Sequence, residues 1–429
     1  MKKYLLSSLL VILLTACVSR ESVFSTLQGN TGLIAYLGVD GNVYVSDQGG
    51  GNVTQLTKDA SNQSGSGVVY QLPTWAMDGK QLAFIRNSGS SSNLTSNIMV
   101  ADVANDNVKE VYKSTSEHPF YMFWTPDETN ISFLSTAATS GMLILQSVPA
   151  KGGDRTIIDT GSPYYWSWAP DGKTLIIHSG GTSTSTMPDH LAFIRIQDTG
   201  VVEDGLDTTP ASFQAPAWSP DGSHIALVRL QDGKKELILT DGKGRYEQTV
   251  DTIINSYSAF SWSINSDKLA YIDGTLTQLN AGVIGDLKIM DITTSKKTST
   301  DAKNVFAYFW SPLGDKIIYF VPVVGNSSGN SGSSSNNQQV FLQTFLMDVS
   351  TGKSTELFTF LPTQEFFSIL PYFDQYQQSN TIWSPDGQKL VLSFIDQNGN
   401  SGIAVVNLSG QQPDTKLIGD GVLAFWSWK

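Results

Sequence analysis

Trp218–Gly222 reads WSPDG, and close copies recur as WAPDG at Trp168–Gly172 and WSPDG at Trp383–Gly387. Proline presets φ for the first central position of a tight turn, aspartate bonds nearby backbone amides, and glycine accepts a positive φ at the exit. Short β-rich runs follow each copy, such as His224–Val228 and Glu236–Leu239 after Trp218. Each copy therefore predicts a tryptophan-bearing strand, a tight turn and further short strands.

The tryptophan that opens this unit recurs at regular distances along nearly the whole chain. The anchors are Trp75, Trp124, Trp168, Trp218, Trp262, Trp310, Trp383 and Trp428. Six of the seven successive spacings lie between 44 and 50 residues, and the spacing from Trp310 to Trp383 is 73. Four short strands in each repeat of this length predict a β-propeller. We infer that each tryptophan packs against the next unit and fills the gap between two sheets.

The two ends of the chain carry complementary parts of one unit. Val422–Trp428 is a single strand without followers, whereas Leu33–Leu37, Val43–Ser46 and Val53–Leu56 lack a tryptophan-bearing first strand. Together they complete one sheet, which closes the ring and hides its edges. The predicted fold class is all-β, an eight-bladed β-propeller closed by the C-terminal strand, and the alternative is a seven-bladed ring in which the unit after Trp310 is dismantled. Because no segment keeps a 3.6-residue apolar period, we expect few helices.

The repeated unit resembles the TolB-like, WD40-like PD40 repeat family of bacterial exported proteins, over about residues 31–428. Four units depart from the pattern: Trp75 is followed by AMDG, Trp124 by TPDE, Trp262 by SIN and Trp310 by SPLG. We expect these units to keep the sheet and to use other turn types. The resemblance implies that binding takes place in the central channel or on the face opposite the turns.

The first thirty residues indicate export. Lys2 and Lys3 precede the apolar stretch Tyr4–Leu14, which is the layout of a secretory signal and is too short to span a bilayer. The stretch leads into Leu14–Cys17 (LTAC), which resembles the bacterial lipobox and contains the only cysteine of the chain. A plain signal peptide with an incidental cysteine is the alternative. We expect residues 1–16 to be a signal peptide, 17–30 to be the lipidated Cys17 with a flexible tether, and 31–429 to be the propeller on the periplasmic or extracellular side of the membrane.

Composition excludes several classes of protein. An apolar fraction of 40% excludes wholesale disorder, and a single cysteine excludes an intramolecular disulfide. The formal charge is 27 − 39 = −12, and removal of residues 1–16 takes away two lysines and makes it 25 − 39 = −14. An acidic chain is repelled by phosphates, so we expect no nucleic-acid partner.

The extra length between Trp310 and Trp383 falls in two loops that we expect on one face. Gly325–Asn337 is a low-complexity Gly/Ser/Asn segment, and Leu361–Asn380 is rich in aromatic residues. The candidate binding residues in the second loop are Phe366, Phe367, Tyr372, Phe373 and Tyr376, because exposed aromatic residues are common in binding hot spots. The alternative is that these rings fold inward and plug the channel mouth.

Motifs for catalysis or metal binding are weak. Gly325–Gly329 matches G-x-S-x-G, but it lies in a Ser/Gly tract with no helix after it. The four histidines do not pair at metal-ligand spacing. Asp396–Asn400 resembles the start of a calcium loop, yet Ser401 replaces the expected glycine and no glutamate closes the loop, so a hairpin turn is the alternative. We expect no catalytic residues, metal or cofactor.

The leading functional hypothesis is a non-catalytic, lipid-anchored and monomeric module that binds a protein, peptide or glycan of the cell envelope. The alternative is a glycan-acting hydrolase or lyase, which would require two carboxylates facing each other in the channel. A structural subunit of a larger assembly is the third possibility.

Overall fold

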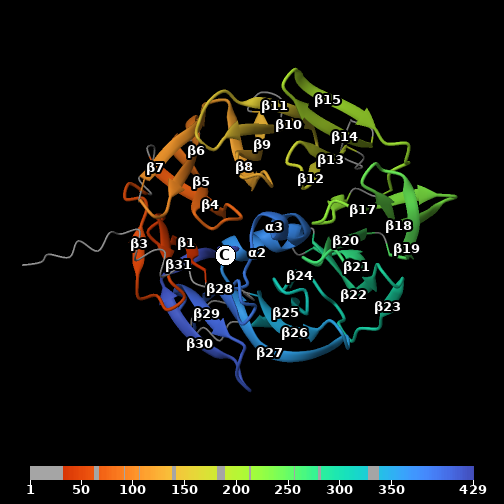
Figure 1. Ribbon diagram of the computed structural model, residues 1–429. Coiled ribbons are helices and arrows are strands. Elements are labelled where there is room, and N and C mark those ends of the chain that lie inside the picture. The colour runs from red at the N-terminus through yellow and green to blue at the C-terminus, as the bar shows by residue number, and fades with distance from the viewer. Residues whose placement is uncertain are drawn as a thin grey trace, which may run out of the picture.

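The computed structural model describes residues 32–429, apart from 62–66, 91, 106, 138–141, 181–188, 212–213, 256, 279–281 and 327–337. The signal peptide, Cys17, the tether and most of the Gly/Ser/Asn loop lie outside the described residues. Antiparallel sheets stand side by side around a central axis, and helices lie at its centre (Figure 1). The fold is therefore a nearly all-β propeller, as the repeat predicts.

Five four-stranded sheets follow one another along the chain, each running from an inner strand to an outer one. They are β4 (Gly67–Trp75), β5 (Gln81–Ser90), β6 (Asn93–Asp102) and β7 (Asn107–Ser114); β8 (Glu117–Trp124), β9 (Asn130–Ala137), β10 (Leu143–Pro149) and β11 (Thr156–Gly161); β12 (Tyr164–Trp168), β13 (Thr174–Ser179), β14 (His190–Gln197) and β15 (Gly200–Gly205); β16 (Ala217–Trp218), β17 (His224–Gln231), β18 (Lys234–Asp241) and β19 (Tyr246–Thr252); and β20 (Tyr257–Trp262), β21 (Lys268–Leu276), β22 (Val283–Asp291) and β23 (Lys296–Thr298). The middle strands are buried on both faces, as in β13 and β17, because each sheet packs between two others.

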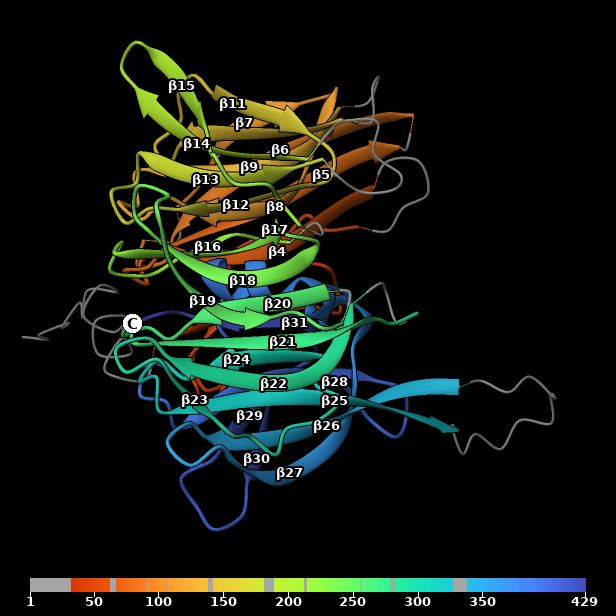
Figure 2. The same cartoon turned by 90° about the vertical axis from the view of Figure 1, so that its right-hand side faces the viewer.

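The units of Trp310 and Trp383 share one seven-stranded sheet. Its strands are β24 (Ala307–Trp310), β25 (Lys316–Asn326), β26 (Gln338–Asp348), β27 (Lys353–Pro362), β28 (Lys389–Ile395), β29 (Ser401–Asn407) and β30 (Asp414–Gly419). Two residue pairs join the halves, Leu361 with Ile395 and Pro362 with Phe394. The β25–β26 hairpin extends well beyond the ring at one end (Figure 2).

The first and last strands of the fold lie in the same sheet. β31 (Gly421–Trp426) pairs antiparallel with β1 (Ile34–Gly38), so that Ala35 lies opposite Phe425 and Leu37 opposite Leu423. β2 (Val43–Ser46) and β3 (Val53–Gln55) complete this four-stranded sheet. The predicted pairing of the chain ends is confirmed, and it seals the ring.

Seven turns after inner strands share one backbone form in the described residues. In each, an N–H donates over 2.8–3.1 Å to the carbonyl three residues earlier: Gly79 to Ala76, Glu128 to Thr125, Gly172 to Ala169, Gly222 to Ser219, Ser266 to Ser263, Gly314 to Ser311 and Gly387 to Ser384. The expectation of other turn types is wrong. Glu128 (φ 60°) and Ser266 (φ 61°) adopt the left-handed conformation that glycine has elsewhere.

Most of these turns begin with a serine or threonine whose hydroxyl takes part in the turn, a role that the predicted motif did not include. The Ser219 hydroxyl donates to Asp221 Oδ1 over 2.6 Å and accepts from His224 N at 3.0 Å. In the unit of Trp310, which lacks the aspartate of the motif, the Ser311 hydroxyl donates to Asp315 instead, over 2.8 Å. The Ser263 hydroxyl in the unit of Trp262 likewise donates to Asp267 over 2.8 Å, so these two divergent units use an acid further along the chain.

Two short helices and a 3₁₀ turn lie between β27 and β28 in the chain. They are α2 (Gln364–Ile369), η1 (Leu370–Tyr372) and α3 (Phe373–Ser379). The Thr363 hydroxyl caps α2 by accepting from Phe366 N at 3.3 Å, and it donates to the carbonyl of Val422 in β31 over 2.5 Å. The insertion thus begins at the sheet that seals the ring and turns into the channel (Figure 1).

Candidate functional site

A cavity of about 620 Å³ opens from the channel at the end of the ring where the seven turns lie, and we call it the turn-end cavity. Its walls combine anchor tryptophans with turn prolines from around the whole ring. The lining prolines are Pro126, Pro170, Pro220, Pro312 and Pro385, and the lining tryptophans are Trp124, Trp168, Trp218, Trp262, Trp310, Trp383 and Trp428. This face is opposite the one that the family resemblance implies for binding.

The anchor tryptophans hold neighbouring sheets together through their indole N–H groups. Five of them donate to the carbonyl just before the anchor of the preceding sheet: Trp75 to Phe425 (3.3 Å), Trp124 to Thr74 (2.9 Å), Trp262 to Ala217 (3.0 Å), Trp310 to Ser261 (3.3 Å) and Trp383 to Phe309 (3.2 Å). The tryptophans therefore bridge two sheets as predicted, but toward the preceding unit instead of the next. Because these donors are used, they stiffen the cavity wall and are not available to a ligand.

The same pattern corrects the last anchor. Trp75 donates to the carbonyl of Phe425, so the residue equivalent to the other anchors is Trp426, not Trp428. Trp426 is fully buried at the end of β31, whereas Trp428 is half-buried and lines the turn-end cavity. The Trp-Ser-Trp sequence at positions 426–428 fits either residue, and only the strand register distinguishes them.

Trp168 and Trp218 depart from the ladder. Trp168 donates to the Ser132 hydroxyl over 3.0 Å, and that hydroxyl in turn donates to the carbonyl of Phe123, so the link runs through a relay. Trp218 donates to Gly222 of its own turn over 3.2 Å and lies 5.6 Å from Phe193 between ring centroids. Its ring therefore lines both the turn-end cavity and a smaller cavity of about 380 Å³ beside β14.

The five candidate aromatic residues lie mainly in the channel filling. Phe366 packs near Phe320 and Phe360, Phe367 near Phe306, Phe373 near Tyr308 and Tyr376 near Tyr121, with ring centroids 4.6–6.3 Å apart. The expected exposure is wrong for Phe366 and Phe373, which are 0% and 1% exposed, and Tyr372 alone of the five is largely exposed, at 44%. The inward-folding alternative describes the structure, because burying these rings removes apolar area from water.

The helix α3 forms the floor of the turn-end cavity. Tyr121 in β8 donates its hydroxyl to the carbonyl of Gln375 over 3.0 Å, and the Ser167 hydroxyl in β12 donates to Gln378 Oε1 over 3.1 Å. Gln377 and Gln378 line the cavity from this floor. Among the described residues, the amide nitrogen of Gln377 and the indole nitrogen of Trp428 are buried without a hydrogen-bond partner. Both nitrogens are covered by neighbouring atoms, so the exposed part of the lining comes from the other atoms of these residues.

Charge is almost absent from the lining. Glu128 and Lys429 are the charged residues among those that line the turn-end cavity. Desolvation by burial, followed by the nearby charge of Asp78, raises the pKa of Glu128. The facing carboxylates that the glycan-acting alternative requires are not present among the described lining residues, since Glu128 is the one acid there. The lining suits an uncharged, partly apolar ligand.

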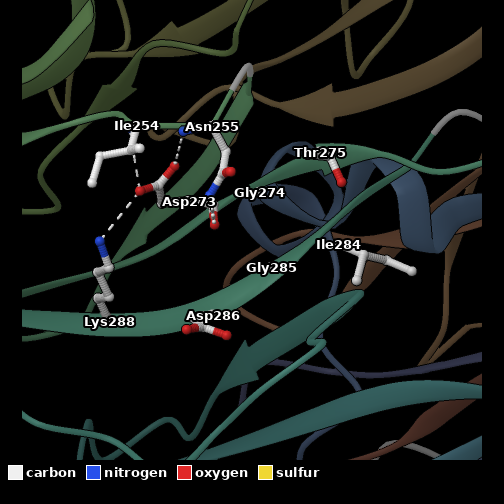
Figure 3. A pocket seen from close by; sticks show the side chains of 9 residues that line it. All are labelled: Ile254, Asn255, Asp273, Gly274, Thr275, Ile284, Gly285, Asp286 and Lys288. Carbon is white, nitrogen blue, oxygen red and sulfur yellow. Dashed lines mark hydrogen bonds and ion pairs between the residues drawn. The ribbon is translucent and has the colours of Figure 1, made fainter.

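A smaller pocket of about 320 Å³ lies at the other end of the β20–β23 sheet (Figure 3). The Asp273 carboxylate accepts from Asn255 N at 3.0 Å and Ile254 N at 3.4 Å, and it pairs with Lys288 at 3.3 Å. Lys288 also pairs with Asp251 at 3.1 Å. Since these groups satisfy one another, they hold the loop before β20 in place and leave little free chemistry in the pocket.

The remaining motif candidates have structural partners. Asp396 accepts from Asn398 N and Asn400 N at 2.8 and 2.7 Å in the hairpin turn between β28 and β29, which is the alternative interpretation of that segment. His178 is buried, with Nδ1 2.7 Å from the carbonyl of Gln214. No cluster of three or more histidine, cysteine or acidic residues suited to a metal ion occurs in the part of the chain that the structure describes.

Comparison with known proteins shows the fold alone. No family model and no curated protein sequence matches the chain. Among solved structures, the dihydro-heme d1 dehydrogenase NirN in complex with DHE is similar with a TM-score of 0.54 at 12% identity, covering 93% of this chain and 76% of that one. A putative TolB from Agrobacterium tumefaciens gives a TM-score of 0.38 at 15% identity over 77% of this chain and 90% of its own. TolB from Acinetobacter baumannii gives 0.35 at 13% identity, over 77% and 78%.

Proposed function

We propose that this chain is a non-catalytic, lipid-anchored propeller of the bacterial cell envelope that binds a protein, peptide or glycan in its turn-end cavity. The observation that carries the proposal is the cavity itself, a concave and largely uncharged site of about 620 Å³ with a wall of hydrogen-bonded tryptophans. Cavities of this size, with mostly apolar walls and a few polar groups, are typical of ligand sites.

The ring in this proposal has eight blades. Six four-stranded sheets each supply one blade, and the seven-stranded sheet supplies two. Its second half has three long strands, and the Thr381–Trp383 segment takes the inner position through bridges from Thr381 to Trp426 and from Trp383 to Leu390. The indole of Trp383 also reaches back to Phe309 like the other anchors. This support favours two blades there over a dismantled one.

Membrane attachment rests on the sequence Leu14–Cys17 and its sole cysteine. Acyl chains on Cys17 would supply the affinity for the bilayer. No helix in the described part of the chain is long and apolar enough to cross a membrane. Mass spectrometry of the full-length protein purified from a bacterial membrane tests this step. An acylated N-terminal Cys17 supports it, and an unmodified cysteine contradicts it.

A matched pair of charge substitutions tests the binding site. Ile264 lines the turn-end cavity and is 46% exposed, whereas Leu417 is 57% exposed on the outer strand β30. We expect Ile264→Arg to abolish binding of an uncharged ligand and Leu417→Arg to leave it unchanged, because only the first brings a charge to the lining.

The assay uses a photo-crosslinking amino acid at Met77, another lining residue, in both backgrounds and in the parent chain. Cell-envelope extract supplies protein and peptide candidates, and neutral glycan fragments are titrated separately against tryptophan fluorescence. A crosslinked species, or a fluorescence change, that disappears with Ile264→Arg and persists with Leu417→Arg supports the cavity. Equal capture by both variants contradicts it, and release of new reducing ends from the glycans would favour the enzyme alternative.

A further inference from the structure

We infer that the turn-end cavity faces the membrane to which the chain is anchored, so that its ligand enters from the membrane side. The inference rests on the proposed lipidation of Cys17. Two features of the described structure carry it, namely where the chain enters the fold and which end of the channel is closed.

The chain enters the fold at the mouth of the cavity. A Cβ built on Gly32 would lie 2.9 Å from Pro385 Cγ and 2.9 Å from Trp426 Cδ1. Leu33 N then donates to the Ser427 hydroxyl over 2.9 Å, and Ser427 N donates back to the carbonyl of Leu33 over 2.8 Å. Pro385 and Ser427 both line the turn-end cavity. Residue 32 is therefore fixed at the rim of that cavity, next to the inner strand of its sheet.

The length of the tether limits how the ring can be turned. Fifteen Cα–Cα steps separate Cys17 from Gly32 (32 − 17), which reach about 50 Å when fully extended. A flexible coil of fifteen residues in general has a root-mean-square length of about 21 Å. With the cavity toward the bilayer, the tether runs directly from the rim to the membrane. This orientation needs none of the extended reach.

The opposite orientation requires the tether to run around the ring. It would cross three strand positions outward, about 14 Å, and then follow the height of a strand of about eight residues, about 26 Å. The resulting path of about 40 Å is close to the full reach of the segment and about twice its coil length. Only a nearly straight tether lying on the protein surface could follow it, so the cavity-inward orientation dominates.

The far end of the channel is closed by the insertion after β27. Phe366 and Phe373 are buried against the β24–β25 strands, and Tyr376 packs edge to face with Tyr121 of β8, with ring centroids 5.0 Å apart. α3 lies at the centre of the ring (Figure 1), and its residues Gln377 and Gln378 form the inner end of the turn-end cavity. The cavity lies at the turn end, where the chain enters the fold, and the tether aims that end at the membrane.

Single introduced cysteines test the orientation, because acylation of Cys17 leaves the chain with no other thiol. Leu313→Cys places a label in a turn at the cavity end, and Asn398→Cys places one in the β28–β29 hairpin at the opposite end. The lipidated full-length protein is reconstituted into vesicles of neutral and anionic phospholipid that contain an acceptor-labelled lipid. Energy transfer from each label to the acceptor is then compared.

We expect clearly higher transfer from position 313 than from position 398, and a smaller difference after insertion of a 20-residue Gly/Ser linker into the tether. Equal transfer, or higher transfer from position 398, would overturn the inference while leaving the anchor intact. Mass spectrometry of the same samples separates this failure from that of the proposed function. An unmodified Cys17 would show that the anchor itself is absent, and the inference would fall with it.

Discussion

Replacing Asp374 with asparagine is expected to make the stability of the protein less dependent on pH between about 4 and 7. Asp374 lies on α3 in the channel, is 8% exposed, and accepts a hydrogen bond from Gln375 N at 3.0 Å. The ion pairs of the described residues do not include it. Burial raises the pKa values of Tyr121, Tyr165 and Tyr308. The charge of the nearby Asp374 carboxylate raises them further. Desolvation by burial raises the pKa of Asp374 to about 7.

The size of the effect follows from the difference between the folded and unfolded pKa values. The unfolded chain titrates near 3.8 and the folded chain near 7, a difference of about 3 units, or about 4 kcal/mol at 1.36 kcal/mol per unit. The contribution of the neutral carboxyl is fully present below the unfolded pKa. It is lost as the pH rises to about 7, and it does not change further above that pH.

Thermal and urea unfolding of the parent chain and Asp374→Asn at pH 4, 5, 6, 7 and 8 measure this difference. We expect the variant to gain stability relative to the parent as the pH rises, by about 4 kcal/mol in total, with the rise ending near pH 7. A constant offset from the new amide does not affect the slope. If the two proteins keep the same difference at every pH, Asp374 is not the buried, unpaired acid that the structure describes.

Three further substitutions test the ring itself. Glu128→Gly should stabilise the protein by about 1 kcal/mol in urea unfolding, because glycine removes the cost of the left-handed φ of 60° and the repulsion from Asp78; an unchanged midpoint would count against strain at this turn. Trp383→Phe removes the indole donor that satisfies the buried carbonyl of Phe309, so it should lower the free energy of unfolding by about 1–3 kcal/mol. A loss below about 0.5 kcal/mol would show that the indole hydrogen bonds between sheets add little stability. Burial acts to raise the pKa of Asp251, but the hydrogen bonds that it accepts from Lys297, Tyr271 and Lys288 lower the pKa overall. Asp251→Asn should therefore destabilise the chain more at pH 7 than at pH 3, where the parent carboxylate is losing its charge. A loss of stability that is the same at both pH values would refute this.

The turn chemistry explains why so much of the ring could be predicted from the sequence. Trp383–Gly387 contains within five residues the end of an inner segment, the tight turn and the tryptophan that bridges two sheets. Such local signals survive in divergent units, since Glu128 and Ser266 take up the same conformation without glycine. The pairing of β1 with β31 followed from counting strands at the two ends.

The register of β31, and the sheet toward which each anchor tryptophan points, could not be derived from the sequence in the same way. Trp426 ends β31 and Trp428 follows two residues later, so a strand period of two in the sequence fits either, and only the bond from Trp75 to the carbonyl of Phe425 identifies the anchor. Whether an indole contacts the next sheet or the preceding one depends on the position of a carbonyl in that other sheet. The orphan donors of Trp428 and Gln377 are likewise known only once the neighbouring groups are placed.

The inward folding of the aromatic segment was one of the two alternatives, but its helices were not predicted, and the cause is their length. α2 and α3 span six and seven residues, too few for a helical period to stand out and too few for a stable isolated helix. The one local signal is Thr363, a suitable N-cap, but Phe366 occupies the position where a capping box has glutamate or glutamine. These helices exist because the ring around them buries their aromatic side chains.

The width of the ring gives a reason for the inward direction. If the ring has eight blades, as we propose, its inner strands stand further apart than side chains alone can bridge, and an empty channel would forfeit packing contacts along every inner strand. An aromatic insertion after β27 fills that space from Tyr308 on one side to Tyr121 on the other. The extra residues between Trp310 and Trp383 therefore form two different features. The β25–β26 hairpin extends outward, and α2–α3 turn inward. Both segments looked like loops in the sequence because the void that distinguishes them is a property of the closed ring.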